Sequence, residues 1–321
     1  MDLKFNKVGV LGTGVMGAQI AAHVSNAKIE VYAFDMTQDV AVDGLEKCKK
    51  LKPSPFYNPK TADLIIPLNY ENDLEKLKEC DWVVEAISER LDWKQDLYKK
   101  IIPYLKDGAV VSSNTSGISL SDLSDGMPED FLKSFFITHF FNPPRYMKLV
   151  EIIASEKTDK DMIDYTDNFL TNTLGKNVVH AKDTPNFIAN RIGVYGMNVT
   201  LQEAMQRNLS IEDVDSLTGT LIGRPKSATF RTADVVGLDT MCFVSKTAYD
   251  KCLDDPERQV FKLPDYIDTM VANKWLGQKT KQGFYKKIDK GVIHSLDLKT
   301  LEYSPMKKKR YAAFTIAKEN T

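Results

Sequence analysis

The spacing of apolar residues changes near residue 185 and divides this chain into two parts with different secondary-structure patterns. Over roughly the first 185 residues, short apolar runs alternate with segments that have the period of an amphipathic helix. The apolar runs predict strands at residues 7–11, 29–34, 81–87, 109–114 and 135–137. The run at 81–87 is apolar on both faces, which is typical of a buried strand in a parallel sheet. Strands that alternate with helices indicate an α/β fold with a doubly wound, mostly parallel sheet of the Rossmann type.

The pattern changes near residue 185. A turn at residues 183–186 precedes a long stretch with helical periodicity at residues 187–205. No strand pattern occurs between about residues 187 and 275. The second part of the chain is therefore predicted to be a smaller, all-α domain.

Beyond Tyr285 the pattern weakens, and residues 292–294 and 301–303 either form a small hairpin or lack order. We predict a Rossmann domain at residues 1–185, an all-helical domain at residues 186–286 and a weakly patterned tail at residues 287–321.

Composition excludes several functional classes. A chain of 321 residues is long for one hydrophobic core, which agrees with two domains. A net charge of −1 provides no field for nucleic acid or an anionic membrane. The chain has no run of 18 apolar residues and no signal-peptide pattern, so we expect a cytoplasmic protein. Its four cysteines have neither the spacing nor the histidine neighbours of a metal site, so no metal is expected.

A glycine motif follows the first predicted strand and opens a helix at residues 12–17, GTGVMG. Gly12 permits a tight turn, Gly14 lets the backbone approach a pyrophosphate, and Gly17 lets helix and strand pack closely. The N-terminus of the helix offers free N–H groups to the phosphates. In this context the motif predicts a dinucleotide site that includes Val15 and Met16.

Asp35, at the end of the second predicted strand, selects the cofactor. Its carboxylate accepts hydrogen bonds from ribose hydroxyls and repels a 2′-phosphate, while Met36 and Thr37 supply no cation. NAD is therefore favoured over NADP. FAD uses the same motif, but the chain has no second flavin motif.

Candidate catalytic groups stand where predicted strands end: Ser116, His139 and Glu151. The ends of strands in a doubly wound sheet line one crevice. A histidine with a carboxylate partner is a general base that works near neutral pH. From the residues alone, His139 is as well explained as a core residue and Ser116 as a helix cap.

A resemblance decides between these interpretations. Nine segments occur in a familiar order and spacing: residues 12–17, 83–86, 113–116, 139–143, 147–151, 182–185, 190–191, 236–239 and 282–285. Together they resemble the L-3-hydroxyacyl-CoA dehydrogenases of fatty acid β-oxidation over about residues 7–286.

The resemblance implies a role for each catalytic candidate. His139 takes the 3-hydroxyl proton as hydride leaves C3, and Glu151 orients the imidazole and stabilises its cation. Ser116 binds the reacting oxygen beside the nicotinamide ribose, and Asn190 completes the polar lining. Further matches to cofactor-contacting positions are Asp35, Glu89, Lys94, Asn142 and Lys279. For Glu89, Lys94 and Lys279 the alternative interpretation is an ordinary surface charge.

The resemblance also implies an acyl-CoA substrate and a helical domain that binds substrate and forms a homodimer. The sequence departs from the family in a short, proline-broken stretch after the second strand, where relatives contact CoA. The segment at residues 223–231 resembles the branch in which the dehydrogenase precedes an enoyl-CoA hydratase, so the chain is either a dimer or part of a longer bifunctional protein. Two alternatives stay open: a dehydrogenase of a free hydroxy acid, and a non-catalytic, crystallin-like relative.

Overall fold

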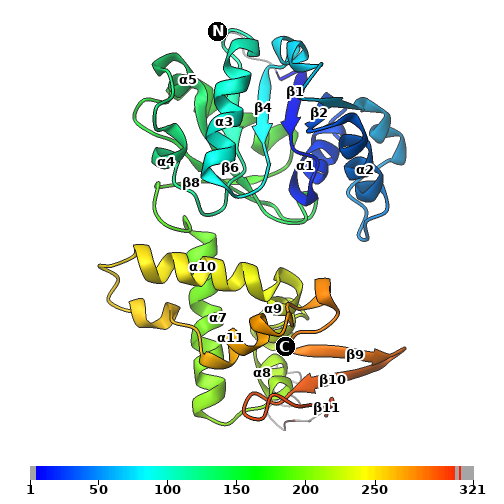
Figure 1. Cartoon of the computed structure of the whole chain (residues 1–321), viewed down its shortest axis with the longest axis vertical. Helices are drawn as coiled ribbons and strands as arrows, with labels where there is room; N and C mark the ends of the chain where they lie inside the picture. The colour runs from blue at the N-terminus through cyan, green and yellow to red at the C-terminus, as the bar shows by residue number, and fades with distance from the viewer. Residues whose placement is uncertain (1–4, 308–310, 312–321) are drawn as a thin grey trace. The chain divides into compact units, whose positions relative to one another are not determined.

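The computed structural model describes residues 5–307 and 311, and the predicted tail beyond these positions lies outside the described residues. The chain divides into two compact units, Met1–Ile188 and Ala189–Thr321 (Figure 1). Each unit has its own secondary structure and its own hydrophobic clusters.

The first unit is built on an eight-stranded sheet with the order β3-β2-β1-β4-β5-β6-β7-β8. The strands are β1 Lys7–Leu11, β2 Glu30–Asp35, β3 Ile65–Asn69, β4 Trp82–Glu85, β5 Val110–Ser113, β6 Phe135–Phe140, β7 Leu149–Ile153 and β8 Asn177–Ala181. Neighbouring strands are parallel except for β6 and β7, which are antiparallel. This arrangement confirms the predicted Rossmann-type sheet.

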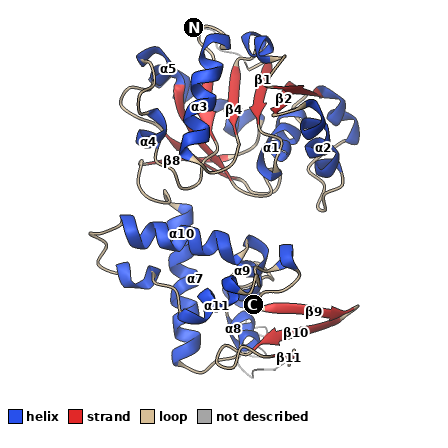
Figure 2. Ribbon diagram, viewed as in Figure 1, coloured by secondary structure: helices blue, strands red, loops and turns tan. Residues whose placement is uncertain are grey.

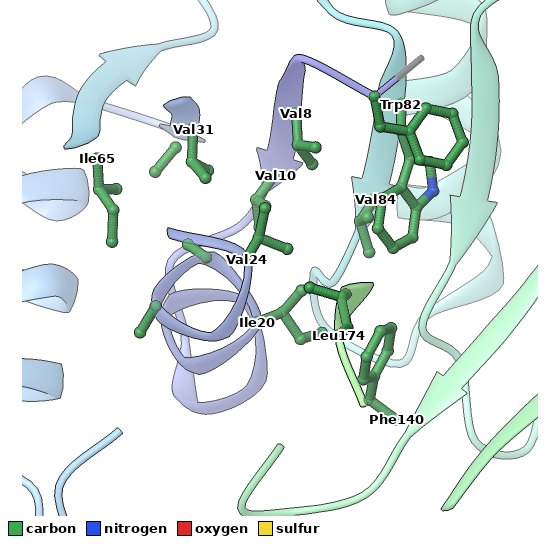
Figure 3. Close-up of a cluster of buried hydrophobic side chains, with 14 of the residues drawn as sticks. Val8, Val10, Ile20, Val24, Val31, Ile65, Trp82, Val84, Phe140 and Leu174 are labelled. Atoms are coloured by element: carbon green, nitrogen blue, oxygen red, sulfur yellow. The ribbon is translucent and has the colours of Figure 1, made fainter. Parts of the chain in front are cut away.

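Helices cover both faces of this sheet (Figure 2). Their bounds are α1 Val15–Ser25, α2 Gln38–Lys49, α3 Leu91–Ile101, α4 Leu120–Ser124, α5 Glu129–Ser134 and α6 Lys160–Asn168. The cluster on one face contains buried side chains of α1, α2 and α6, and the cluster on the other contains those of α3, α4 and α5. Ile20 and Val24 of α1 lie against Val8 and Val10 of β1 (Figure 3).

The pairing of β6 with β7 differs from the sequence-based picture. Glu151 was expected after a strand, at its end, but it lies inside β7 and directly opposite His139 of β6. The physical reason is the short link between these strands. A parallel neighbour needs a crossover of roughly a dozen residues or more, usually helical, whereas a shorter link reverses the chain and pairs the strands antiparallel.

The second unit begins with helices, as expected. They are α7 Ala189–Gln206, α8 Ile211–Leu217, α9 Phe230–Val236, α10 Leu238–Lys251 and α11 Asp265–Ala272. Ser210 and Asp213 form a capping box at the start of α8, which satisfies N–H groups at that helix end.

A three-stranded antiparallel sheet follows these helices, in the stretch for which the sequence left a hairpin or no order open. It has the order β11-β10-β9, with β9 Tyr285–Asp289, β10 Val292–Leu296 and β11 Tyr303–Pro305 (Figure 2). Leu296 and Leu298 are buried in one cluster with Phe284 and side chains of the helices. The start of the predicted tail is thus part of the core of the second unit.

We expect Leu296→Ala to lower the free energy of unfolding by about 2–5 kcal/mol, because it removes a buried side chain and leaves a cavity. Ile288→Ala is the matched control, since Ile288 is 51% exposed on β9. Urea denaturation of both variants measures the effect. Equal stability of the two variants would contradict a structural role for the small sheet.

Candidate functional site

The glycine motif forms the turn between β1 and α1, as the sequence predicts. Gly12 has a φ of +95°, and a Cβ there would lie 2.9 Å from the Ala86 carbonyl oxygen. A Cβ on Gly17 would lie 1.8 Å from the Gly12 carbonyl oxygen, so this position tolerates only glycine. Gly14 faces open space. The turn therefore leaves room for a ligand at the N-terminus of α1, where N–H groups favour an anion.

A cavity of about 580 Å³ adjoins this turn. It is lined by Gly12, Gly14, Asp35, Met36, Tyr70, Ala86, Ile87, Ser88, Trp93, Asp96, Leu97 and Lys100. The cavity lies at the carboxyl ends of β1, β2 and β4, where a doubly wound sheet binds its ligands. Trp93 and Lys100 were missed by the sequence analysis, because α3 lies far from the glycine motif in the chain.

Asp35 is fixed in the wall of this cavity. Its Oδ2 accepts hydrogen bonds from the Thr13 backbone N and Oγ1 at 2.7 and 2.6 Å, and its Oδ1 accepts one from the Met36 N at 2.8 Å. These bonds hold the carboxylate at the end of β2 in one orientation. The carboxylate is therefore preorganised at the wall of the cavity.

His139 and Glu151 form a buried pair across β6 and β7. The distance from His139 Nδ1 to Glu151 Oε2 is 2.7 Å, and both side chains are buried. Glu151 Oε1 accepts a further bond from the Ile188 N at 3.0 Å. Because a carboxylate only accepts hydrogen bonds, His139 donates from Nδ1, which leaves Nε2 as the acceptor nitrogen. The rings of Phe141 and Phe187 pack against the imidazole.

Glu89 organises the loop that carries Ser116. Its Oε1 accepts hydrogen bonds from Thr115 Oγ1 at 2.6 Å and from the Ser116 and Gly117 backbone N at 2.8 Å each. Burial alone would raise the pKa of Glu89, but Lys94 and these bonds outweigh it and lower the pKa. Glu89 thus remains ionised at neutral pH and holds the Ser116 loop.

Lys94 is not a surface charge, because its side chain is only 1% exposed. Its Nζ lies 2.6 Å from Glu85 Oε1 and 3.6 Å from Glu89 Oε2. Glu85, fully buried, also accepts hydrogen bonds from Tyr98 Oη at 2.7 Å and Ser113 Oγ at 2.6 Å. Sequence analysis missed Glu85, although a carboxylate inside an apolar strand run was a visible signal.

The remaining candidates lie in different places. Asn142 accepts a hydrogen bond from Gln19 Nε2 of α1 at 3.0 Å. Asn190 lies in the first turn of α7, and Lys279 forms an ion pair with Asp239. These last two belong to the second unit, so their roles at the site remain predictions.

Two general findings concern the described residues. None of their helices is long and apolar enough to cross a membrane. Within residues 5–307, no group of three or more His, Cys, Asp or Glu side chains is placed to hold a metal ion.

Comparison with known families matches both units. Residues 7–184 match the NAD binding domain of 3-hydroxyacyl-CoA dehydrogenase, and residues 187–287 match the C-terminal domain of the same family. The chain belongs to the 3-hydroxyacyl-CoA dehydrogenase family. The predicted NAD-binding Rossmann domain and the resemblance are thereby confirmed.

Individual relatives agree with this membership. A Bacillus subtilis protein named a probable 3-hydroxyacyl-CoA dehydrogenase is 45% identical over 99% of the chain, but the chain spans only 43% of its length. A Deinococcus radiodurans protein of the same name is 44% identical over 89% of the chain and 84% of its own length. The structure of a Ralstonia eutropha (S)-3-hydroxybutyryl-CoA dehydrogenase superposes with a TM-score of 0.74 at 27% identity, covering 87% of this chain and 98% of that one.

We expect Glu85→Gln to lower the free energy of unfolding by about 3–5 kcal/mol, because it leaves the buried Lys94 ammonium without its nearest counter-charge. Urea denaturation measures the loss. Glu46→Gln removes an exposed ion pair with Lys49 and serves as the control, with no change expected. If both variants unfold alike, the buried pair does not have the structural role assigned to it.

Proposed function

We propose that the chain oxidises a (3S)-3-hydroxyacyl-CoA to the 3-oxoacyl-CoA with NAD, and reduces it in the reverse direction. The single observation that carries this proposal is the buried His139–Glu151 pair, which leaves the imidazole Nε2 as a proton acceptor in a domain of an NAD-binding family. When bound, NAD accepts the hydride from C3 of the substrate.

The residues present fit the cofactor. Gly14 leaves open space at the N-terminus of α1 for a pyrophosphate, and the Asp35 carboxylate offers acceptors to ribose hydroxyls in the adjoining cavity. Val15 and Met16 continue this turn into α1. Glu89, Lys94, Asn142 and Lys279 remain proposed cofactor contacts, supported by their match to the family motifs.

In this mechanism His139 Nε2 takes the hydroxyl proton as the hydride leaves, which avoids a protonated ketone. General-base help of this kind contributes about 10²–10⁴ in rate. Glu151 stabilises the imidazolium that forms, and it is itself held by the Ile188 N–H. In the reverse direction the same imidazolium protonates the oxygen.

Ser116 is proposed to hydrogen-bond the reacting oxygen, and Asn190 to complete the polar lining. The network of Glu89 around residues 115–117 supports the first role, because it fixes the backbone on which Ser116 stands. A preorganised donor costs no reorganisation when the oxygen changes charge.

An acyl-CoA is the proposed substrate, in keeping with the family. Lys47 of α2, close in sequence to the proline-broken stretch, lines a cavity of about 430 Å³ that adjoins Gly14 and Val15. A free hydroxy acid, in contrast, has no CoA group and would not need this additional cavity. The His139–Glu151 pair argues against a non-catalytic relative.

We further propose a homodimer, or a place within a longer bifunctional chain, and a cytoplasmic location. The exposed apolar side chains of Val235, Val236 and Phe243 on the second unit support an interface. The longer Bacillus relative supports a larger protein. Four free cysteines support a reducing compartment.

The oxidation of NADH in the presence of acetoacetyl-CoA or free acetoacetate tests the substrate class. We expect turnover with acetoacetyl-CoA alone, because only this compound offers the CoA group. Turnover of the free acid alone would favour the hydroxy acid alternative, and turnover of neither would contradict dehydrogenase activity.

We expect His139→Gln to lower kcat by at least about 100-fold, because the amide accepts no proton, while the Kd for NADH stays nearly constant. Stopped-flow kinetics and a fluorescence titration measure the two quantities. His180→Gln is the control, since His180 pairs with Asp167 away from β6. A His139→Gln rate above about a tenth of wild type would exclude the base assignment.

A further inference from the structure

A third cavity, of about 510 Å³, is lined only by residues of the second unit. It is lined by Arg231, Asp234, Gly277, Gln278, Lys281, Tyr285, Lys287 and Ile293. These residues come from α9, the turn before β9, β9 itself and β10. None of the roles assigned above uses this cavity.

Two carboxylates, the buried Asp234 and the partly buried Asp215, connect the elements that line the cavity. Asp215 accepts hydrogen bonds from the backbone N of Thr229, Phe230 and Arg231 and from Tyr285 Oη. Asp234 accepts bonds from the Phe284 and Tyr285 backbone N at 2.7 and 2.8 Å. The start of α9 and the start of β9 are therefore fixed relative to each other.

The same packing orients Arg231. Its guanidinium carbon lies 4.7 Å from the centroid of the Tyr285 ring, and Tyr285 is in turn anchored to Asp215. Within residues 5–307, the guanidinium has no hydrogen bond or ion pair with a carboxylate. An arginine that is stacked on an aromatic ring, with a guanidinium free of hydrogen bonds to carboxylates among the described residues, is suited to an anion.

Further polar groups surround Arg231. The side-chain nitrogens of Gln278, Lys281 and Lys287 likewise have no hydrogen-bond or ion-pair partner among the described residues. Asp234 is the single acidic side chain in the lining, and it is buried with its oxygens engaged by backbone N–H groups. The lining therefore contains three cationic side chains and one carboxyl group whose oxygens accept backbone hydrogen bonds, which favours an anionic ligand.

We propose that this cavity binds a phosphate-bearing ligand. Arginine and lysine donate charge-assisted hydrogen bonds to phosphate oxygens, and arginine does so with two parallel bonds. The volume falls within the range of about 300–1,000 Å³ that is usual for small-molecule sites, and it exceeds the need of an inorganic phosphate. A ligand of about mononucleotide size fits, with Ile293 and the Tyr285 ring as its apolar contacts.

Two sources share this chemistry: a free phosphate or nucleotide, and the phosphorylated adenosine end of CoA. Isothermal titration of the whole chain distinguishes them, with inorganic phosphate, ADP and CoA as probes. NADH is kept saturating so that the glycine-motif cavity of the first unit is occupied. The variants are Arg231→Met and the double variant Lys281→Ala/Lys287→Ala. Lys290→Ala, in the turn after β9, is the matched control.

We expect both cavity variants to raise the Kd of at least one probe by at least about tenfold, and Lys290→Ala to change it by less than about twofold. An effect on CoA alone identifies the CoA end, and a shared effect on ADP and phosphate identifies a general phosphate site. The double variant changes exposed side chains, so it separates binding from folding. The proposal is overturned if no probe binds wild type below about 10 mM, or if the cavity variants bind as the control does. Because the titration measures binding, its result does not depend on whether the chain has the proposed dehydrogenase activity.

Discussion

The antiparallel pairing of β6 with β7 is the constraint on which the proposed chemistry depends. This pairing places Glu151 opposite His139, so that a carboxylate and an imidazole meet inside the sheet. Two such groups are costly to bury alone, and their hydrogen bond offsets part of that cost. The geometry also selects the donor nitrogen of the imidazole and leaves the other as the acceptor.

A second buried network holds the surroundings in place. Glu85, Lys94 and Glu89 connect β4 and α3 to the loop after β5, so that the Ser116 backbone has a defined position. Its charges lie in a low dielectric, where an unpaired member is expensive. The His139–Glu151 pair is therefore held by the pairing of β6 with β7, and the Ser116 loop is held by its hydrogen bonds to Glu89.

Much of the fold followed from pattern alone, and the exceptions have physical causes. The runs at β1, β2, β4, β5 and β6 are apolar because helices cover both of their faces. The sequence did not predict the edge strands β3 and β8, because Pro67 interrupts the apolar run of β3 and β8 is partly exposed. The small sheet of the second unit was left open because its strands are short and half-covered.

The candidate site was predictable where a local motif carries the chemistry, as for Gly12 and Asp35. The motif could not show that Trp93 and Lys100 line the same cavity, because that depends on how α3 packs on the sheet. Lys94 shows the same limit, since a lysine in a charged helix does not indicate its own burial. From the sequence, His139 and Glu151 were grouped through the family resemblance. The register of β6 and β7 explains why they meet, because it places the two residues directly opposite each other.

The most direct test of the proposed base is the tautomer of His139, read from the ¹⁵N chemical shifts of its ring at about pH 8, where an ordinary imidazole is neutral. The account predicts a proton on Nδ1, shared with Glu151, and a bare Nε2. A proton on Nε2 would contradict it, because His139 would then have no acceptor for the substrate hydroxyl.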